Sequence, residues 1–168
     1  MNRRGFLILL GAFGGLAACG ERPRVLPQGT EQEEAQKVQD LMLAILPLLA
    51  AGEMERLKDE EKIMLPSRWR RQVKQLTELA DLQKQLQAHP GAPRLGAVHV
   101  EGRWALLESV HMGDALIGKA DLPWFFVYFS GQWRWLPSSI MKDPAIEGMM
   151  NSHFDHLWAD WQAKHSVR

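Results

Sequence analysis

Three polar residues in the second half of the chain have the side-chain types used in acid–base chemistry, namely His99, Glu108 and Asp114. A histidine and a carboxylate within hydrogen-bond reach can exchange protons with a substrate when an apolar site shifts their pKa values. We expect His99 and Glu108 to share one strand face but to lie four or five positions apart. The favoured interpretation is therefore that these groups reach the sheet rim or find backbone partners.

A second candidate set, His153, His156 and Asp160, falls at i, i+3 and i+7 of an expected C-terminal helix. Imidazole and carboxylate groups together suit a divalent transition metal. One helix supplies only part of a ligand shell, because zinc sites normally draw ligands from more than one element. We expect a solvated polar flank and no cofactor, with metal binding as the alternative.

The aromatic residues form a third candidate set, since the chain has seven tryptophans and only one tyrosine. Such a concentration of large rings builds either a core or the wall of a binding site. Aromatic cross-strand pairs are ordinary stabilisers of sheets, so a core is favoured and a ligand-binding wall is the alternative. The residues of this candidate wall are Trp104, Trp124, Phe126, Tyr128, Trp133 and Trp135.

Motif and charge patterns exclude several function classes. The sequence contains no glycine-rich phosphate loop and no Gly-x-Ser-x-Gly, and its only cysteine is Cys19, so an enzyme of a motif-bearing class is not expected. Lys plus Arg and Asp plus Glu number 20 each, and this balance gives no reason to propose nucleic acid, which needs a concentrated basic face. The basic run 68–71 follows an acidic stretch, which favours a helix of mixed charge.

The N-terminus has the layout of an export signal. Arg3 and Arg4 precede an apolar run over 5–15, which is shorter than the ~20 residues that span a bilayer. The segment Leu16-Ala17-Ala18-Cys19 then resembles the lipobox of bacterial lipoproteins. This resemblance implies that the Cys19 thiol receives a diacylglycerol and that residues 1–18 are removed.

Lipidation predicts an anchored protein of the cell envelope. Each buried acyl methylene contributes about 0.8 kcal/mol, so two or three chains hold a protein stably on its membrane. In the sorting rule of enteric lipoproteins, an aspartate after the cysteine signals retention at the inner membrane. Gly20 stands at that position, so the resemblance implies the outer membrane, facing the periplasm. The segment 3–7 also resembles a twin-arginine signal, and the general secretory route remains the alternative. The expected partners are the membrane and an envelope protein.

Composition divides the rest of the chain into a tether and one domain. Residues 19–30 contain two prolines and two glycines and are typical of a spacer. Residues 31–168 are long enough for a single core. Removal of Arg3 and Arg4 leaves 18 basic residues against 20 acidic ones, which is close to neutral.

Helical periodicity dominates the first half of the domain. A capping box at Thr30 and Glu33 predicts a helix over 31–51, kinked at Pro47 and ended by Gly52. A short helix follows from residue 53. A third is expected from Ser67, as N-cap, to residue 89. At the other end of the chain, a helix opening at 143–144 is expected to run to about 165.

From residue 95 the apolar period changes to two, which predicts two hairpins. In the first, a turn at 101–102 places His99 opposite Trp104. In the second, a turn at 130–131 places Tyr128 opposite Trp133, and Phe126 opposite Trp135. A short strand is expected within 115–120. Both faces of the second hairpin are largely apolar, so each needs a cover, and the C-terminal helix can provide one.

The predicted fold class is α+β, with N-terminal helices packed on a bent antiparallel sheet of about four strands, plus a C-terminal helix. This order resembles the nuclear-transport-factor-like, or cystatin-like, group over most of 31–137. The segments that carry the resemblance are 50–57 and the Gly-x-Trp hairpin at 131–135. The group's cone-shaped interior is its usual ligand or catalytic pocket. The added helix at about 144–165 departs from the pattern and is expected near the cone mouth or on its outside.

These observations favour a non-enzymatic envelope module that binds a protein partner or a hydrophobic ligand. Two alternatives remain. One is an enzyme of the nuclear-transport-factor-like fold that acts on a small cyclic substrate with His99 and Glu108. The other is a periplasmic metal-binding protein that uses His153, His156 and Asp160.

Overall fold

The helical half of the chain comes first, as the sequence predicts. The computed structural model describes residues 26–165, so the predicted export signal, Cys19 and most of the tether lie outside the described residues. The α-helices of this half are α1 (Glu31–Ala51), α2 (Met54–Asp59), α3 (Ser67–Arg70) and α4 (Thr77–Ala88), with a short 3-10 helix, η1 (Val73–Gln75), before α4.

Helix α1 has the bounds that its local signals predict. The Thr30 hydroxyl accepts from the Glu33 backbone at 3.2 Å, and the Glu33 carboxylate accepts from the Thr30 backbone at 2.7 Å. At the other end, Gly52 has the left-handed conformation, with φ of 73°. Pro47 lies inside the helix. The capping box and the terminal glycine are both confirmed.

The prediction of one continuous helix from Ser67 to residue 89 is wrong. Ser67 is the first residue of α3 and makes no capping bond, and Leu76 is extended before α4 begins. Tertiary contacts explain the break. The Trp69 indole donates to Asp143 at 3.0 Å, and Val73 and Leu76 are buried. These tertiary contacts override the helical propensity of the segment and interrupt the helix.

The strands form two antiparallel sheets that continue into one another. One sheet has the order β1-β4-β5 and the other β2-β3-β6-β7. The pairs β1–β4 and β2–β3 keep the same register, and the Gly96 amide donates to the Ser109 carbonyl at the bend between them. The strands are β1 (Pro93–Leu95), β2 (Val98–Glu101), β3 (Trp104–Leu107), β4 (Val110–Met112), β5 (Ala115–Ile117), β6 (Trp124–Phe129) and β7 (Gln132–Leu136).

The two predicted hairpin registers have different outcomes. The β6–β7 register is confirmed, with Tyr128 opposite Trp133. In the β2–β3 hairpin His99 lies opposite Leu106 rather than Trp104, because the turn is at 102–103. Gly102 has φ of 58° at the first turn position, which is the type II′ arrangement. The observed register differs from the predicted one by two residues, so each side chain stays on the sheet face on which it was predicted.

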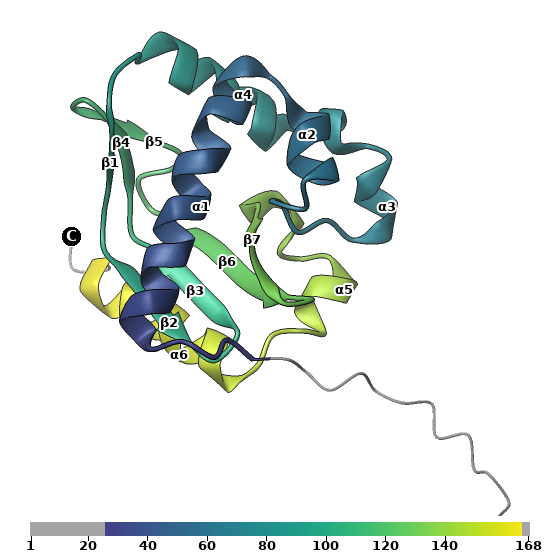
Figure 1. Cartoon of the computed structure of the whole chain (residues 1–168), viewed down its shortest axis with the longest axis vertical. Helices are drawn as coiled ribbons and strands as arrows, with labels where there is room; N and C mark the ends of the chain where they lie inside the picture. Colours follow the sequence, from purple (N-terminus) through teal and green to yellow (C-terminus); the bar gives the residue numbers. More distant parts are fainter. Residues whose placement is uncertain (1–25, 166–168) are drawn as a thin grey trace, which may run out of the picture.

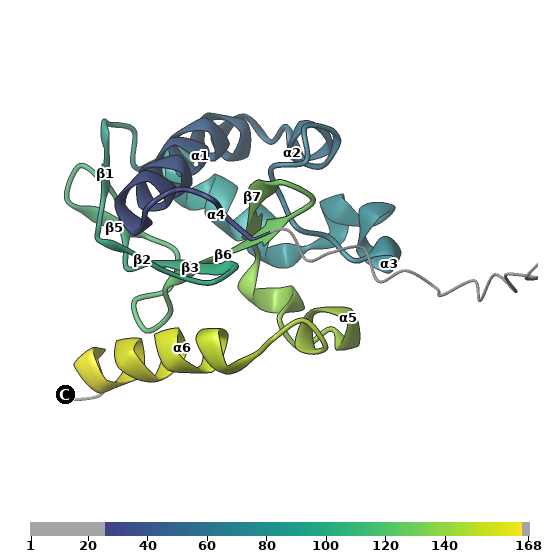
Figure 2. The same cartoon turned by 60° about the horizontal axis from the view of Figure 1, so that its bottom comes forward.

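Helices cover both faces of the four-stranded sheet. Helix α1 lies across one face and α6 (Ser152–His165) across the other, as Figures 1 and 2 show. On the α1 side the Trp133 indole reaches Glu34 at 2.7 Å. On the α6 side the Phe154 ring lies 5.0 Å from Trp104 and 5.5 Å from Phe125. The predicted α+β class, with a C-terminal helix on the sheet, is confirmed.

The C-terminal helix is nevertheless divided, which corrects the prediction that it opens at 143–144. After β7 the chain forms a 3-10 helix, η2 (Ser138–Ile140), and then α5 (Pro144–Glu147), which Asp143 caps by accepting from Ala145. Asn151 then accepts from the first-turn amides of α6, and this second cap starts a separate helix. No helix within 26–165 is long and apolar enough to cross a membrane.

Candidate functional site

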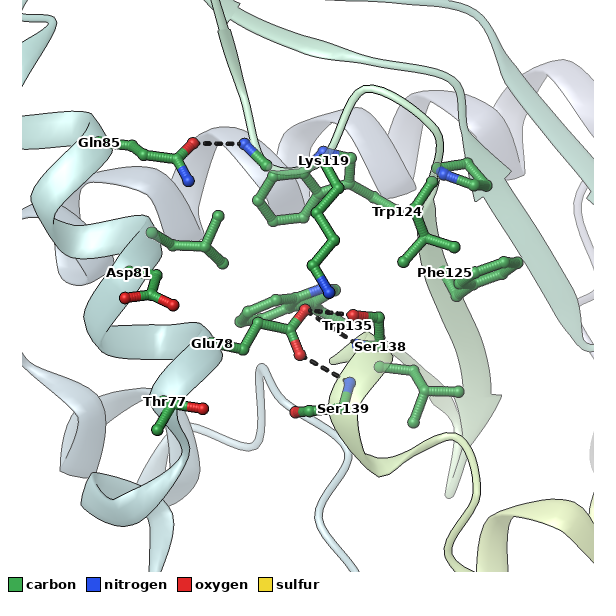
Figure 3. Close-up of a pocket in the computed structure, with 15 residues that line it drawn as sticks. Thr77, Glu78, Asp81, Gln85, Lys119, Trp124, Phe125, Trp135, Ser138 and Ser139 are labelled. Atoms are coloured by element: carbon green, nitrogen blue, oxygen red, sulfur yellow. Dashed lines mark hydrogen bonds between the residues drawn. The ribbon is translucent and has the colours of Figure 1, made fainter. Parts of the chain in front are cut away.

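Helix α4, the β5–β6 loop and the segment after β7 enclose a cavity of about 180 Å³, which we call the α4 pocket. Figure 3 shows that its side chains come from all three segments. No single segment of the sequence therefore predicts the site. The lining residues used below are Glu78, Asp81, Leu82, Gln85, Gly118, Lys119, Leu122, Trp124, Trp135, Ser138 and Ser139.

Glu78 fixes one wall of the pocket. Its Oε1 accepts from the Ser138 amide at 3.0 Å and from the Ser138 hydroxyl at 2.9 Å, while its Oε2 accepts from the Ser139 amide at 2.7 Å. The carboxylate thereby satisfies the first amides of η2, which have no partner within that helix. Helix α4 is thus tied directly to the end of β7, and this wall is preformed.

The loop after β5 is fixed to the same helix. The Gly118 amide donates to Gln85 Oε1 at 2.8 Å. Gly118 has φ of 93°, and a Cβ at this position would lie 3.3 Å from the Trp124 indole. A residue with a side chain would be strained here, so glycine lets the loop turn closely over the ring.

The pocket combines an apolar floor with a charged rim. The rings of Trp124 and Trp135 lie 5.5 Å apart at 42° and are both buried. Asp81 and Lys119 are exposed at the rim, and neither makes an ion pair with another described residue. Such a site can enclose a small apolar group while its polar groups orient the rest of a ligand.

The other residues of the predicted aromatic wall lie elsewhere. Phe126 is fully buried in the core, and the Tyr128 ring meets Trp133 edge-on at 5.4 Å. Trp104 is on the opposite face, against α6. Sequence reasoning therefore named Trp124 and Trp135 of the pocket. It missed Glu78, Asp81, Gln85 and Lys119, because polar residues on a helix or loop are ordinary surface features.

The structure brings His99 and Glu108 together, closer than their expected separation. His99 Nε2 lies 2.7 Å from Glu108 Oε1, because the observed register makes the two residues diagonal neighbours. They border a cavity of about 310 Å³ between β2, β3 and α6, which we call the β2–α6 cavity. Asp114 lies in the β4–β5 turn and does not line it.

Among the three predicted metal residues, His156 joins α6 to β2. His156 Nδ1 lies 2.6 Å from Glu101 Oε2, and its Nε2 lies 3.7 Å from Asp160 Oδ2. The hydrogen bond to Glu101, aided by the charge of Asp160, raises the pKa of His156 above its usual value of 6.5. His153 instead packs over Gly102. Across residues 26–165, no three His, Cys, Asp or Glu side chains are grouped to hold a metal ion.

The two cavities offer different chemistry to a ligand. The α4 pocket has aromatic rings and a preformed polar frame, whereas the β2–α6 cavity is bordered mainly by charged groups, including Glu31, Glu101 and Lys164. The α4 pocket has the more apolar lining and is the better site for removing an apolar group from water. Comparisons of the chain with models of protein families, with curated proteins and with solved structures found no match.

Proposed function

We propose that this chain is a membrane-anchored lipoprotein of the cell envelope whose domain is a non-enzymatic binding module. The α4 pocket receives an apolar group of its ligand. The observation that carries this proposal is the pair of buried rings, Trp124 and Trp135, at the floor of a pocket with a polar rim. The Leu16-Ala17-Ala18-Cys19 segment supports the anchor, and it lies outside the described residues.

Preorganisation favours binding at this site. Glu78 and Gln85 already hold the two sides of the pocket by hydrogen bonds between α4 and distant segments. A ligand therefore need not order the walls when it enters, and less of its binding free energy is lost. Each square ångström of apolar ligand surface removed from water contributes about 25 cal/mol.

The pocket is tested by filling it. Ser139 is exposed at the rim, and only its backbone amide bonds to Glu78, so Ser139→Trp can cover the opening without removing that bond. Native mass spectrometry of the mature protein isolated from its own cells should detect a retained molecule that Ser139→Trp loses. Ser152→Trp, at the exposed start of α6, is the matched control. A retained molecule that Ser139→Trp keeps would place binding elsewhere, and a bare protein would overturn the proposal.

The anchor is tested at Cys19. Mass spectrometry of the N-terminal peptide should show an acylated cysteine as the first residue, and Cys19→Ala should release the protein from the membrane fraction. A mature N-terminus at another position, or unchanged membrane association of Cys19→Ala, would contradict the lipoprotein assignment. Neither result depends on the α4 pocket, so the two parts of the proposal fail separately.

An acid–base enzyme is the second candidate function, because His99 and Glu108 meet at 2.7 Å beside a cavity. A carboxylate bonded to imidazole can stabilise the protonated ring during general base catalysis. The pair ranks second because both side chains are partly open to water, 36% for His99 and 28% for Glu108. An unchanged cellular phenotype of the His99→Ala, Glu108→Ala double variant would remove this candidate.

A further inference from the structure

We propose that the group bound in the α4 pocket is a methylated ammonium ion of about the size of choline. This inference rests on the proposed function, because it names the chemical class of ligand for the same pocket. Two features carry it: the charge of the rim and the aromatic floor.

The rim has an excess of negative charge. Glu78 and Asp81 are one helical turn apart on α4, and Lys119 is the only cation among the described lining residues. Glu78 accepts three hydrogen bonds, and none of the donors carries a charge that would balance its own. An anionic ligand would therefore face two carboxylates, whereas a cation gains from both.

The floor suits a cation that carries apolar substituents. Tryptophan has the aromatic face that attracts cations best, and cages of aromatic rings are a recurrent site for quaternary ammonium groups. Trp124 and Trp135 present two tilted rings, and Leu82 and Leu122 complete the apolar lining. The volume of about 180 Å³ is close to the ~150 Å³ cavity that accommodates benzene, so one small branched group fits.

Lys119 lies at the opening of the pocket that such a ligand would enter. Figure 3 shows its side chain extending from the β5–β6 loop across the pocket, and it makes no ion pair with Glu78. A lysine ammonium is strongly hydrated and stays at the opening, whereas a methylated ammonium sheds water more readily and can reach the rings. Lys119 thus places a like charge beside the opening, which opposes the entry of a cationic ligand.

The test is titration of the mature protein, in a nonionic detergent, with choline and with its neutral isostere dimethylbutanol, in which carbon replaces nitrogen. Tryptophan fluorescence and calorimetry report binding. The two probes have the same shape, so their difference measures the contribution of charge. We expect choline to bind about tenfold more tightly than dimethylbutanol, because a cation–π contact in a largely desolvated site contributes about 1.4 kcal/mol, which is tenfold in affinity.

Rim variants then locate the charge effect. Asp81→Asn should weaken choline binding about threefold, and Lys119→Ala should tighten it about threefold, because each changes one exposed charge beside the site. Neither should alter the affinity for dimethylbutanol by as much. Asp155→Asn, at an exposed position on α6 outside the pocket, is the control and should have no effect. Phosphocholine separates two sources of the ammonium group. If the ligand is a free solute, choline should bind more tightly than phosphocholine. If the ligand is a lipid headgroup, phosphocholine should bind at least as tightly as choline.

The outcomes separate the two proposals. Equal binding of choline and dimethylbutanol, lost in Ser139→Trp, would overturn the ammonium inference and leave the apolar pocket intact. Choline binding that Lys119→Ala weakens would also overturn the inference, because the lysine would then be a ligand contact. If neither probe binds and the isolated protein retains no molecule, both proposals fail.

Discussion

The indole N–H of Trp133 donates to Glu34 Oε2 at 2.7 Å and joins β7 to the first turn of α1. The other oxygen of the same carboxylate accepts from Lys37 at 2.7 Å and from the Gly29 amide at 3.0 Å. Glu34 is only 2% exposed, so it is a buried charge with a complete set of donors. Burial alone would raise the pKa of Glu34, but the hydrogen bonds from Lys37, Trp133 and Gly29 outweigh it and lower the pKa.

Glu34→Gln should therefore destabilise the fold at neutral pH. The substitution removes the charge and turns an amide donor towards groups that are themselves donors, and we expect a loss of about 1–2 kcal/mol in the free energy of unfolding. Because the folded pKa lies below the ordinary 4.5, this contribution is complete above 4.5 and is lost as the pH falls through the folded value. Urea denaturation at neutral and acidic pH measures both effects.

Glu31→Gln is the control for this prediction. Glu31 is in the same turn of α1 but is exposed, so its loss should change stability by a few tenths of a kcal/mol. If Glu34→Gln matched Glu31→Gln at neutral pH, or if its deficit persisted unchanged in acid, the buried carboxylate would not have the role assigned to it.

Trp133→Phe should cost more stability than Trp104→Phe. Both indoles are buried, at 6% and 1% exposure. The Trp104 indole N–H has no hydrogen-bond partner among residues 26–165, whereas that of Trp133 bonds to Glu34. Removing the Trp133 donor leaves a buried carboxylate oxygen unsatisfied, so the difference should be about 1 kcal/mol or more. Thermal and urea unfolding of the two variants test the order, and the reverse order would contradict it.

Local signals in the sequence predicted the features that depend on neighbouring residues. The Thr30–Glu33 capping box and the turn at 130–131 satisfy backbone groups within a few positions, so their geometry follows from short segments. The break at Leu76 is different, because the segment before it contacts distant residues such as Asp143. The second cap, at Asn151, is itself local, but the apolar periodicity does not reveal it. Helical periodicity alone cannot show such interruptions.

The site was predicted less completely for a related reason. Trp124 and Trp135 stood out because a hairpin register aligns them. Glu78 looked like one of many polar residues on α4, and only its bonds to 138–139, sixty positions away, identify it as a wall of the pocket. The meeting of His99 with Glu108 required a turn at 102–103, and a choice between adjacent two-residue turns is beyond single-sequence reasoning.

The ring of His156 should titrate above 6.5, because the hydrogen bond to Glu101 and the nearby Asp160 stabilise its charged form. A raised folded pKa means that the ion pair stabilises the attachment of α6 fully below 6.5 and loses this effect as the pH rises through the folded value. NMR titration should show Glu101→Gln returning the His156 pKa towards 6.5, with Asp160→Asn having a smaller effect. Asp155→Asn is the control, and a His156 pKa unaffected by Glu101→Gln would contradict the contact.

Ser130→Asn should stabilise the β6–β7 hairpin. Ser130 and Gly131 have φ of 51° and 85°, the pair of positive values that a type I′ turn requires. Serine pays a steric cost in this left-handed region, while asparagine tolerates it through local hydrogen bonding, so we expect a gain of about 0.5 kcal/mol. Ser130→Val, with a β-branched side chain at the same position, should instead lower stability by about 1 kcal/mol or more.

Thermal unfolding of the two Ser130 variants checks both directions at once, and the opposite order would contradict the type I′ assignment. This turn fixes the register that places Phe126 opposite Trp135 and so orients Trp135 towards the α4 pocket. Since residue 130 does not line the pocket, Ser130→Asn should leave ligand affinity unchanged while the melting temperature rises. A change in affinity would instead show that the pocket floor depends on strain in this turn.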